Sequence, residues 1–257
     1  MKDVPLLLLH GWGMHAGIWA DVRRQWSVSD VLAPDLPGYG GTSPLAGGLN
    51  ELAQEMLRHV PDRFDVCGWS LGGLLAQQMA LFAPDRVRRV VLVGATPCFV
   101  TRENWSCGIE KSVLMAFGEE LAQAYEPTLK RFLALQVRGE QAARNNLARL
   151  REQLFARGRP DVAVLQQGLQ ILLETDLRAE TPLMQQPLLL VQGSQDQLTP
   201  PCAAEWLATE VAEAQLIRVS GAAHAPFLSH VTTFVAALQD FLAVSAGDSV
   251  VCMGGAE

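Results

Sequence analysis

Six short, almost continuously apolar runs divide the chain into repeating strand-and-helix units. Bounded by turn residues, they comprise Leu6–Leu9, Val31–Ala33, Phe64–Cys67, Val90–Val93, Leu188–Val191 and Leu216–Val219. Strands buried on both faces lack the polar–apolar alternation of half-exposed strands, and continuous apolarity is typical of parallel sheets. Segments with helical spacing lie between the runs, at Leu49–Val60, Leu71–Phe82, Ala203–Ala208 and Thr232–Ala243. This alternation predicts an α/β protein with a mostly parallel central sheet flanked by helices.

A long helical segment interrupts the alternation. Between residues 99 and 181 no run has strand character, and four segments have helical spacing: Val113–Ala124, Thr128–Val137, Glu140–Ala156 and Val162–Glu174. We expect a helical lid (the insertion, residues 99–181) between two parts of one core, residues 1–98 and 182–244. Open α/β sheets bind ligands beyond the carboxyl ends of their strands, and the insertion is expected to cover that edge. Residues 245–257 are rich in glycine and weakly patterned, which predicts a flexible tail.

Charge and hydropathy exclude several classes of function. The 257 residues include 20 Lys and Arg against 27 Asp and Glu, a net charge of −7, whereas general nucleic-acid binders are basic. No apolar stretch approaches the ~18 residues of a membrane span. The run Leu6–Leu9 is shorter than the ~7–15 apolar residues of a signal peptide, and His10-Gly11 interrupts it. We expect a cytoplasmic protein, taken to be a monomer, that binds neither nucleic acid nor membranes.

The cysteines are odd in number and widely spaced. They are Cys67, Cys98, Cys107, Cys202 and Cys252. No C-x-x-C pair indicates a zinc site, and a chain of this length does not need a disulfide framework. We therefore expect free thiols in a reducing compartment and no bound metal.

The segment Gly68-Trp69-Ser70-Leu71-Gly72 fits the G-x-S-x-G pattern of a nucleophilic serine. A predicted strand precedes it and a predicted helix follows, which is the context that the pattern requires. The glycines permit a tight turn that directs the serine side chain out of the sheet. A capping serine in a glycine-rich turn is the alternative interpretation. We predict that Ser70 is the nucleophile.

A nucleophilic serine needs a general base that is oriented by a third group. His224 follows the last predicted strand in the loop Ser220-Gly-Ala-Ala-His-Ala-Pro, and Asp196 follows the strand Leu188–Val191. The order Ser70, Asp196, His224 along the chain is the order of this type of triad. His230 is the second candidate for the base. The remaining candidates, His59, Asp161 and Asp176, are expected at the surface.

Two backbone N–H groups are candidates for an oxyanion hole. The N–H of Leu71 is unpaired at the start of the helix that follows Ser70. The second donor is expected after the first strand, in His10-Gly11-Trp12-Gly13, and we assign it to the N–H of Trp12. The side chains of Trp12 and Trp69 are expected to wall the site, with ordinary core packing as the alternative.

These motifs together resemble the α/β-hydrolase family. The resemblance rests on His10-Gly-Trp-Gly13, Asp35-Leu-Pro-Gly-Tyr-Gly-Gly-Thr-Ser43, the turn at Ser70, and the loops of Asp196 and His224. It implies the α/β-hydrolase fold with a helical lid, and a serine esterase that needs no cofactor.

Within that family the chain is similar to the pimeloyl-[acyl-carrier protein] methyl ester carboxylesterases of biotin biosynthesis. The similar segments are Leu8-Leu-His-Gly-Trp-Gly13, Gly68-Trp-Ser-Leu-Gly-Gly-Leu74, Pro97-Cys-Phe99, Arg131-Phe-Leu-Ala-Leu-Gln136 and Ala223-His-Ala-Pro-Phe-Leu-Ser-His230. The resemblance implies hydrolysis of the methyl ester to the free pimeloyl acid and methanol. It also implies substrate contacts from Trp12, Ser70, Leu71, Phe132, Leu133, Ala134, Leu135, Gln136 and His224.

Basic residues are concentrated in one part of the insertion. The thirty residues Lys130–Arg159 hold eight Lys and Arg but only two acidic residues, Glu140 and Glu152. A positive surface above a site attracts and steers an acidic partner, and an acidic acyl carrier protein fits that description. The candidate docking residues are Arg131, Arg138, Arg144 and Arg151. A solvated helical surface is the alternative.

Three other functions remain open on the sequence alone. A general short-chain esterase or thioesterase would use the same triad without needing a basic insertion. A cofactor-free perhydrolase or carbon–carbon bond hydrolase would also use it. A relative that binds a ligand without catalysis would keep the pocket but not turn over an ester.

Overall fold

The computed structural model describes residues 4–26 and 30–243 of the chain. The predicted tail, residues 245–257, therefore lies outside the described residues, as does Cys252. Six strands form one sheet in the order β2-β1-β3-β4-β5-β6, and each neighbouring pair is parallel. The strands are β1 (Leu6–Leu9), β2 (Val31–Leu32), β3 (Phe64–Trp69), β4 (Val87–Val93), β5 (Leu188–Gly193) and β6 (Ala214–Val219). The predicted parallel α/β sheet is confirmed.

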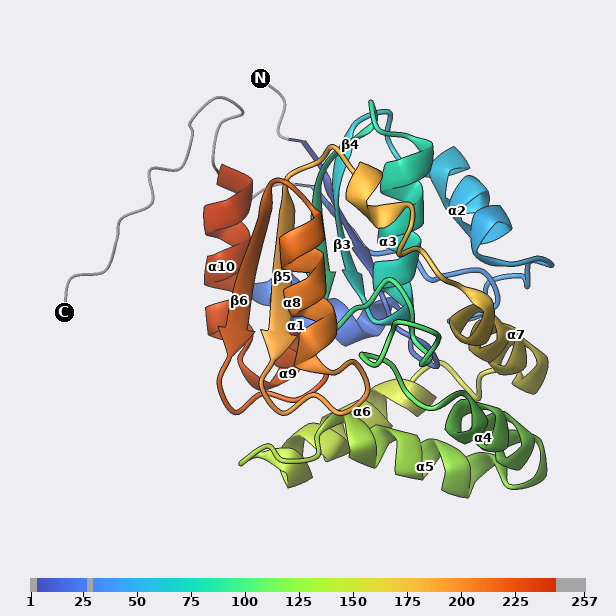
Figure 1. Cartoon of the computed structure of the whole chain (residues 1–257). Helices are drawn as coiled ribbons and strands as arrows, with labels where there is room; N and C mark the ends of the chain where they lie inside the picture. Colours follow the sequence, from blue (N-terminus) through green and yellow to red (C-terminus); the bar gives the residue numbers. More distant parts are fainter. Residues whose placement is uncertain (1–3, 27–29, 244–257) are drawn as a thin grey trace.

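Helices cover both faces of this sheet. On one face lie α2 (Leu49–Arg58), α3 (Leu71–Phe82) and α8 (Pro201–Glu210), and on the other lie α1 (Ala20–Gln25) and α10 (Val231–Ala243) (Figure 1). The central strands β1, β3, β4 and β5 are buried along their whole length or nearly so. Within the described residues, every helix is too short or too polar to cross a membrane.

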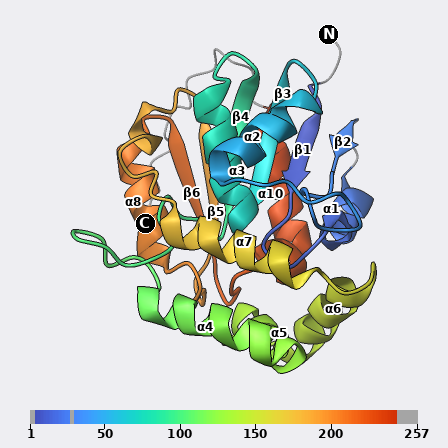
Figure 2. The ribbon, with the colours of Figure 1, turned by 90° about the vertical axis from the view of Figure 1, so that its right-hand side faces the viewer.

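Four helices lie between β4 and β5 in the chain, as the helical spacing predicted. They are α4 (Lys111–Gln123), α5 (Tyr125–Gln136), α6 (Ala143–Phe155) and α7 (Val162–Glu174). In Figure 1, α4, α5 and α6 lie beyond the ends of the sheet toward which β5 and β6 point. Figure 2 shows α7 between these helices and the core. The insertion therefore covers the carboxyl edge of the sheet, where the strand-end loops gather.

Several local predictions differ from the structure. The helix predicted from Glu140 begins only at Ala143, because residues 137–142 form a turn. Strand β6 was predicted as buried but is only partly covered, because it is the edge strand of the sheet. Short helical elements were missed: η1 (Ala16–Trp19), α1, η2 (Thr181–Leu183) and α9 (Pro226–Ser229). Elements of one or two turns carry too few residues to show a helical period.

The prediction that all cysteines are free thiols is wrong. Cys107 and Cys202 form a disulfide, with their Cα atoms 5.7 Å apart at a sequence separation of 95 residues. Cys67 and Cys98 are free and buried. The bond joins the loop before α4 to the first turn of α8. Cysteine spacing could not reveal this pair, because only the folded sheet brings these two segments together.

We predict that this disulfide stabilises the fold. Closing a long loop restricts the unfolded chain, so reduction is expected to lower the free energy of unfolding by about 2–4 kcal/mol. Urea denaturation with and without a thiol reductant measures the difference. A Cys202→Ser variant serves as control, because the reductant should no longer change its stability. Equal stability of the oxidised and reduced wild-type protein would contradict the prediction.

Candidate active site

Ser70 lies in a tight turn between β3 and α3, at the carboxyl edge of the sheet. Its φ of 57° and ψ of −117° belong to a conformation that residues other than glycine rarely adopt. A Cβ on Gly68 would lie 2.1 Å from the carbonyl oxygen of Gly72, and a Cβ on Gly72 would lie 2.5 Å from that of Leu9. The Ser70 N–H donates to the carbonyl of Val93 at 3.1 Å, which anchors the turn to β4. Both glycines of the motif are therefore needed for the turn to close.

His224 lies in the loop after β6, and its backbone is held from both sides. Its N–H donates to the carbonyl of Gln136 in the insertion at 3.0 Å. Its carbonyl accepts a hydrogen bond from Nε1 of Trp69 at 2.8 Å. The side chain of His224 is 1% exposed, so these bonds form away from water. Trp69, which was expected to wall the cavity, is not among its lining residues and instead supports the histidine through this hydrogen bond.

Asp196 lies in the loop after β5, and both of its carboxylate oxygens are occupied. Oδ1 accepts the N–H groups of Leu198 at 2.9 Å and Thr199 at 3.0 Å. Oδ2 accepts the Thr199 hydroxyl at 2.6 Å, the Gln192 amide at 3.1 Å and Nδ1 of His224 at 2.9 Å. Burial alone raises the pKa of Asp196, but the positive charge that His224 carries when protonated and the hydrogen bonds from His224 and Thr199 outweigh it and lower the pKa. The carboxylate is thus held in its ionised form.

The contact with Asp196 determines which nitrogen of His224 can act as a base. An ionised carboxylate only accepts hydrogen bonds, so the proton lies on Nδ1 and Nε2 keeps its lone pair. Ser70 and His224 both line one cavity, although no hydrogen bond joins them in the described structure. The nitrogen of His224 that does not contact Asp196 is therefore the candidate base for Ser70.

The cavity beside these two residues is almost wholly apolar. It lies between the carboxyl edge of the sheet and the insertion. Its lining consists of Trp12, Ser70, Phe99, Ile109, Val113, Leu114, Phe117, Phe132, Leu135, Leu169, Leu172, Leu198 and His224. Only Ser70 and His224 among them carry a hydroxyl or a titratable group. Ser70 and His224 are therefore the lining side chains that can react with a polar group held in this cavity.

The comparisons with known proteins agree with this architecture. Residues 4–231 match the family model described as the alpha/beta hydrolase fold. The chain belongs to the α/β-hydrolase fold family. In Nitrosomonas europaea a relative named pimeloyl-[acyl-carrier protein] methyl ester esterase is 44% identical over 232 residues, which cover 90% of this chain and 92% of that one. A relative of the same name in Chromobacterium violaceum is 41% identical over 94% of this chain and 95% of its own.

Solved structures show the same fold. An esterase from Exiguobacterium antarcticum superposes with a TM-score of 0.85 at 21% identity, covering 94% of this chain and 92% of that chain. At that identity the likeness concerns the arrangement of strands and helices alone.

In this α/β hydrolase, two backbone N–H groups at or beside cavity-lining residues are without a partner among the described residues. The N–H groups of Trp12 and Leu71 make no hydrogen bond within the described residues. The carbonyl of Gly11, in the same peptide as the Trp12 N–H, accepts the N–H of Met14 at 3.2 Å and Nδ1 of His10 at 2.9 Å. Because carbonyl and N–H point in opposite directions in a trans peptide, these bonds also direct the Trp12 N–H.

Of the α5 residues that were expected to contact the substrate, only those on one side of the helix line the cavity. Phe132 and Leu135, three positions apart on α5, line the cavity. Leu133 is buried in the core and Ala134 is exposed, so neither of them lines the cavity as expected. Gln136 acts through its backbone carbonyl on His224.

The other candidate residues lie elsewhere. His230 contacts Ser229 between α9 and α10, and His59 is exposed beside Glu55. Asp161 caps α7, and Asp176 pairs with Arg178. None of these four lines the cavity.

Sequence reasoning missed three groups that support the site. Thr199 and Gln192 hold Asp196, and His10 holds the peptide of Trp12. Thr199 follows Asp196 by three residues in the same loop, a spacing that could have suggested the contact, whereas Gln192 carries no such signal. Among the described residues, no group of three or more His, Cys, Asp or Glu side chains could hold a metal ion.

We predict that His10 makes stability depend on pH. Burial lowers the pKa of His10 from 6.5 to about 4, and its Nε2 accepts the Leu36 N–H at 3.0 Å. Between pH 6.5 and about pH 4, His10 binds a proton in the unfolded chain but not in the folded protein. The free energy of unfolding therefore falls as the pH falls through this range. From pH 7 to pH 5 the wild type should lose about 2 kcal/mol more than His10→Asn. Urea denaturation of both proteins at each pH checks this, and equal losses would contradict it.

Proposed function

We propose that this chain is a serine carboxylesterase that hydrolyses the methyl ester of pimeloyl-[acyl-carrier protein] methyl ester in biotin biosynthesis. The observation that carries the proposal is the apolar cavity whose lining includes both Ser70 and His224. The relatives named for this reaction, matched over nine-tenths of the chain, support the same substrate.

In the proposed reaction Ser70 attacks the ester carbonyl while Nε2 of His224 takes its proton. Asp196 keeps the imidazole in the required tautomer and stabilises it when it becomes charged. The N–H groups of Trp12 and Leu71 stabilise the negative charge on the ester oxygen. His224 then protonates the departing methanol and activates the water that releases the acid. The proposal uses no metal or cofactor.

The lining of the cavity favours the esterified chain over the free acid. A methyl ester is neutral, and methylene groups pack against Trp12, Phe132 and the leucines of α7. A free carboxylate in the same place would lose its hydration without gaining a cationic partner, because no Lys or Arg lines the cavity. The product of hydrolysis is therefore expected to bind more weakly than the substrate.

The basic surface of the insertion supports a carrier-bound substrate. Five of its eight cations pair with carboxylates: Lys130 and Arg159 with Glu126, Arg131 with Glu120, Arg149 with Asp21, and Arg157 with Asp35. The other three, Arg138, Arg144 and Arg151, are exposed and have no ion pair within the described part of the chain. Their charges are available to an acidic protein, so these three arginines, more than Arg131, carry the proposed docking.

We predict that the Ser70→Ala variant loses esterase activity. Removing the nucleophile should lower kcat for a p-nitrophenyl ester at least about a thousandfold. Absorbance of released p-nitrophenol measures the rate, and Ser112→Ala, at an exposed position of α4, serves as control. Equal turnover by the wild type and Ser70→Ala would contradict the assignment of Ser70 as the nucleophile. If the wild type shows no turnover, the alternative of a ligand-binding protein without catalytic activity is favoured.

We also predict that charge reversal separates the carrier substrate from free esters. Arg144→Glu/Arg151→Glu should slow loss of the methyl group from methyl-pimeloyl carrier protein at least about tenfold, and leave p-nitrophenyl ester turnover unchanged. Mass spectrometry of the carrier follows the reaction.

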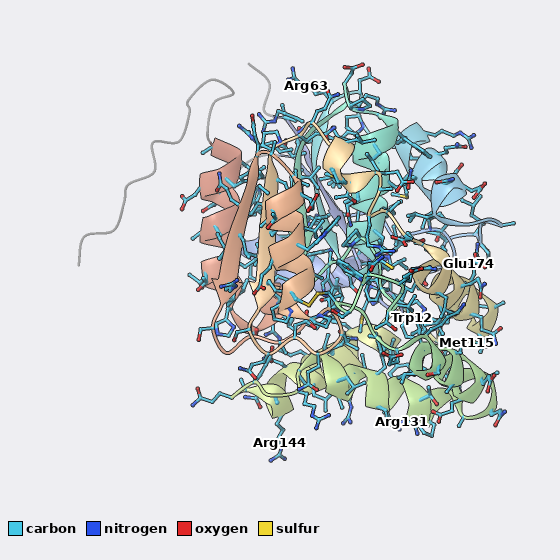
Figure 3. All side chains as sticks on the ribbon, viewed as in Figure 1. Trp12, Arg63, Met115, Arg131, Arg144 and Glu174 are labelled. Carbon is cyan, nitrogen blue, oxygen red and sulfur yellow. A yellow bond between two sulfur atoms is a disulfide. The ribbon has the colours of Figure 1, made fainter. Side chains whose placement is uncertain are left out.

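A matched double variant, Arg58→Glu/Arg63→Glu, changes the net charge equally. Figure 3 places Arg63 at the opposite end of the molecule from Arg144. This variant should keep the wild-type rate on both substrates. If Arg144→Glu/Arg151→Glu slows both substrates equally, or neither, the docking role is rejected.

A further inference from the structure

The turn between α5 and α6, residues 137–142, lies against the loop that carries His224. The N–H of Ala223 donates to Oε1 of Glu140 at 2.8 Å. The next N–H, that of His224 itself, donates to the carbonyl of Gln136 at 3.0 Å. The N–H groups of two consecutive peptides immediately before the imidazole are therefore held by the insertion, while the core holds the first of these peptides at its other end, where the carbonyl of Ala222 accepts the N–H of Gln195 at 2.8 Å.

Glu140 is buried, and its second oxygen also has a partner. It is 8% exposed, and Oε2 accepts the side-chain amide of Asn146 on α6 at 2.7 Å. Glu140 is one of the two acidic residues in the basic stretch Lys130–Arg159 of the insertion. The proposed reaction gives it no role. A carboxylate is removed from water only where hydrogen bonds replace its hydration, and here the N–H of Ala223 supplies one of them.

The same turn approaches the loop of Asp196. Gly139 has a φ of +92°, and a Cβ there would lie 3.1 Å from Oε1 of Gln195. Glycine at this position lets the backbone pass close to the residue that precedes Asp196. One turn of the insertion thus contacts the loops of both Asp196 and His224.

We infer that Glu140 is a positioning residue, whose buried carboxylate holds the Ala223–His224 peptide so that the imidazole faces Ser70. The other contacts of His224 leave this role open. Asp196 fixes the rotation of the ring, and Trp69 fixes the carbonyl, whereas the N–H groups of Ala223 and His224 bond to the insertion alone among the contacts described. Without the acceptor, a buried N–H loses its partner and the loop can shift. A shift of about 1 Å in a reacting group costs on the order of a hundredfold in rate.

The inference rests on the proposed chemistry of Ser70 and His224, and it is tested on a small p-nitrophenyl ester, which needs no carrier. Glu140→Ala should lower kcat about tenfold to a hundredfold and leave KM within about twofold. Glu140→Gln keeps an acceptor oxygen for Ala223, and Asn146 can turn its amide to match, so this variant should keep most of the wild-type kcat. Glu152→Ala, which removes an exposed carboxylate of α6, is the matched control and should resemble the wild type.

Circular dichroism and urea denaturation establish that each variant is folded at the assay temperature. If Glu140→Ala does not fold, Glu140→Asp replaces it: the shorter side chain keeps the charge but withdraws the oxygen from Ala223, and kcat should again fall. A kcat of Glu140→Ala and Glu140→Asp equal to that of Glu152→Ala would overturn the inference, and so would an equal loss in Glu140→Gln and Glu140→Ala. Turnover by the wild type that is abolished in Ser70→Ala keeps the proposed hydrolase in place whichever result is found for Glu140.

Discussion

The buried hydrogen bond between Nδ1 of His224 and Oδ2 of Asp196 governs the arrangement around it. Both side chains are essentially inaccessible to water, so each polar atom needs a partner inside the protein. Glycines at the carboxyl ends of β4 and β5 leave the space that this contact needs. A Cβ on Gly94 would lie 3.1 Å from Nδ1 of His224, and a Cβ on Gly193 would lie 1.9 Å from the carbonyl oxygen of Ala223. Glycines at the ends of β4 and β5 are thus required by the same bond that orients the base.

Core and insertion contribute differently to the site. The core supplies Ser70, Asp196 and His224 on loops at the carboxyl edge of the parallel sheet, as open α/β sheets do. The insertion supplies most of the apolar wall, and its Gln136 and Glu140 hold the backbone of the histidine loop. Because Arg138 lies in the same turn as Glu140, the proposed docking surface and the support of the base share one short segment of the chain.

Much of the fold and the core of the candidate site could be predicted from the sequence. The central strands are buried on both faces and are therefore almost continuously apolar. All six strands were recognised, five of them within two residues at either end, and β4 from its fourth residue onward. Ser70, Asp196 and His224 could be named because each follows a recognisable strand. The supporting groups Gln192, Thr199 and Glu140 could not, because their roles come from contacts between loops that are distant in sequence or have no regular period.

By itself, the sequence determined the parallel α/β sheet, the helical insertion, the order of the three candidate catalytic residues and the excess of positive charge on the insertion. These features are encoded locally, by hydrophobic period, glycine spacing and composition. Tertiary structure alone decided which side chains of α5 face the cavity, which arginines of the insertion pair with carboxylates, and that Cys107 meets Cys202. It also decided that Glu140 meets the histidine loop. Each of these depends on how separate elements pack, and a linear pattern of residue types does not carry that information.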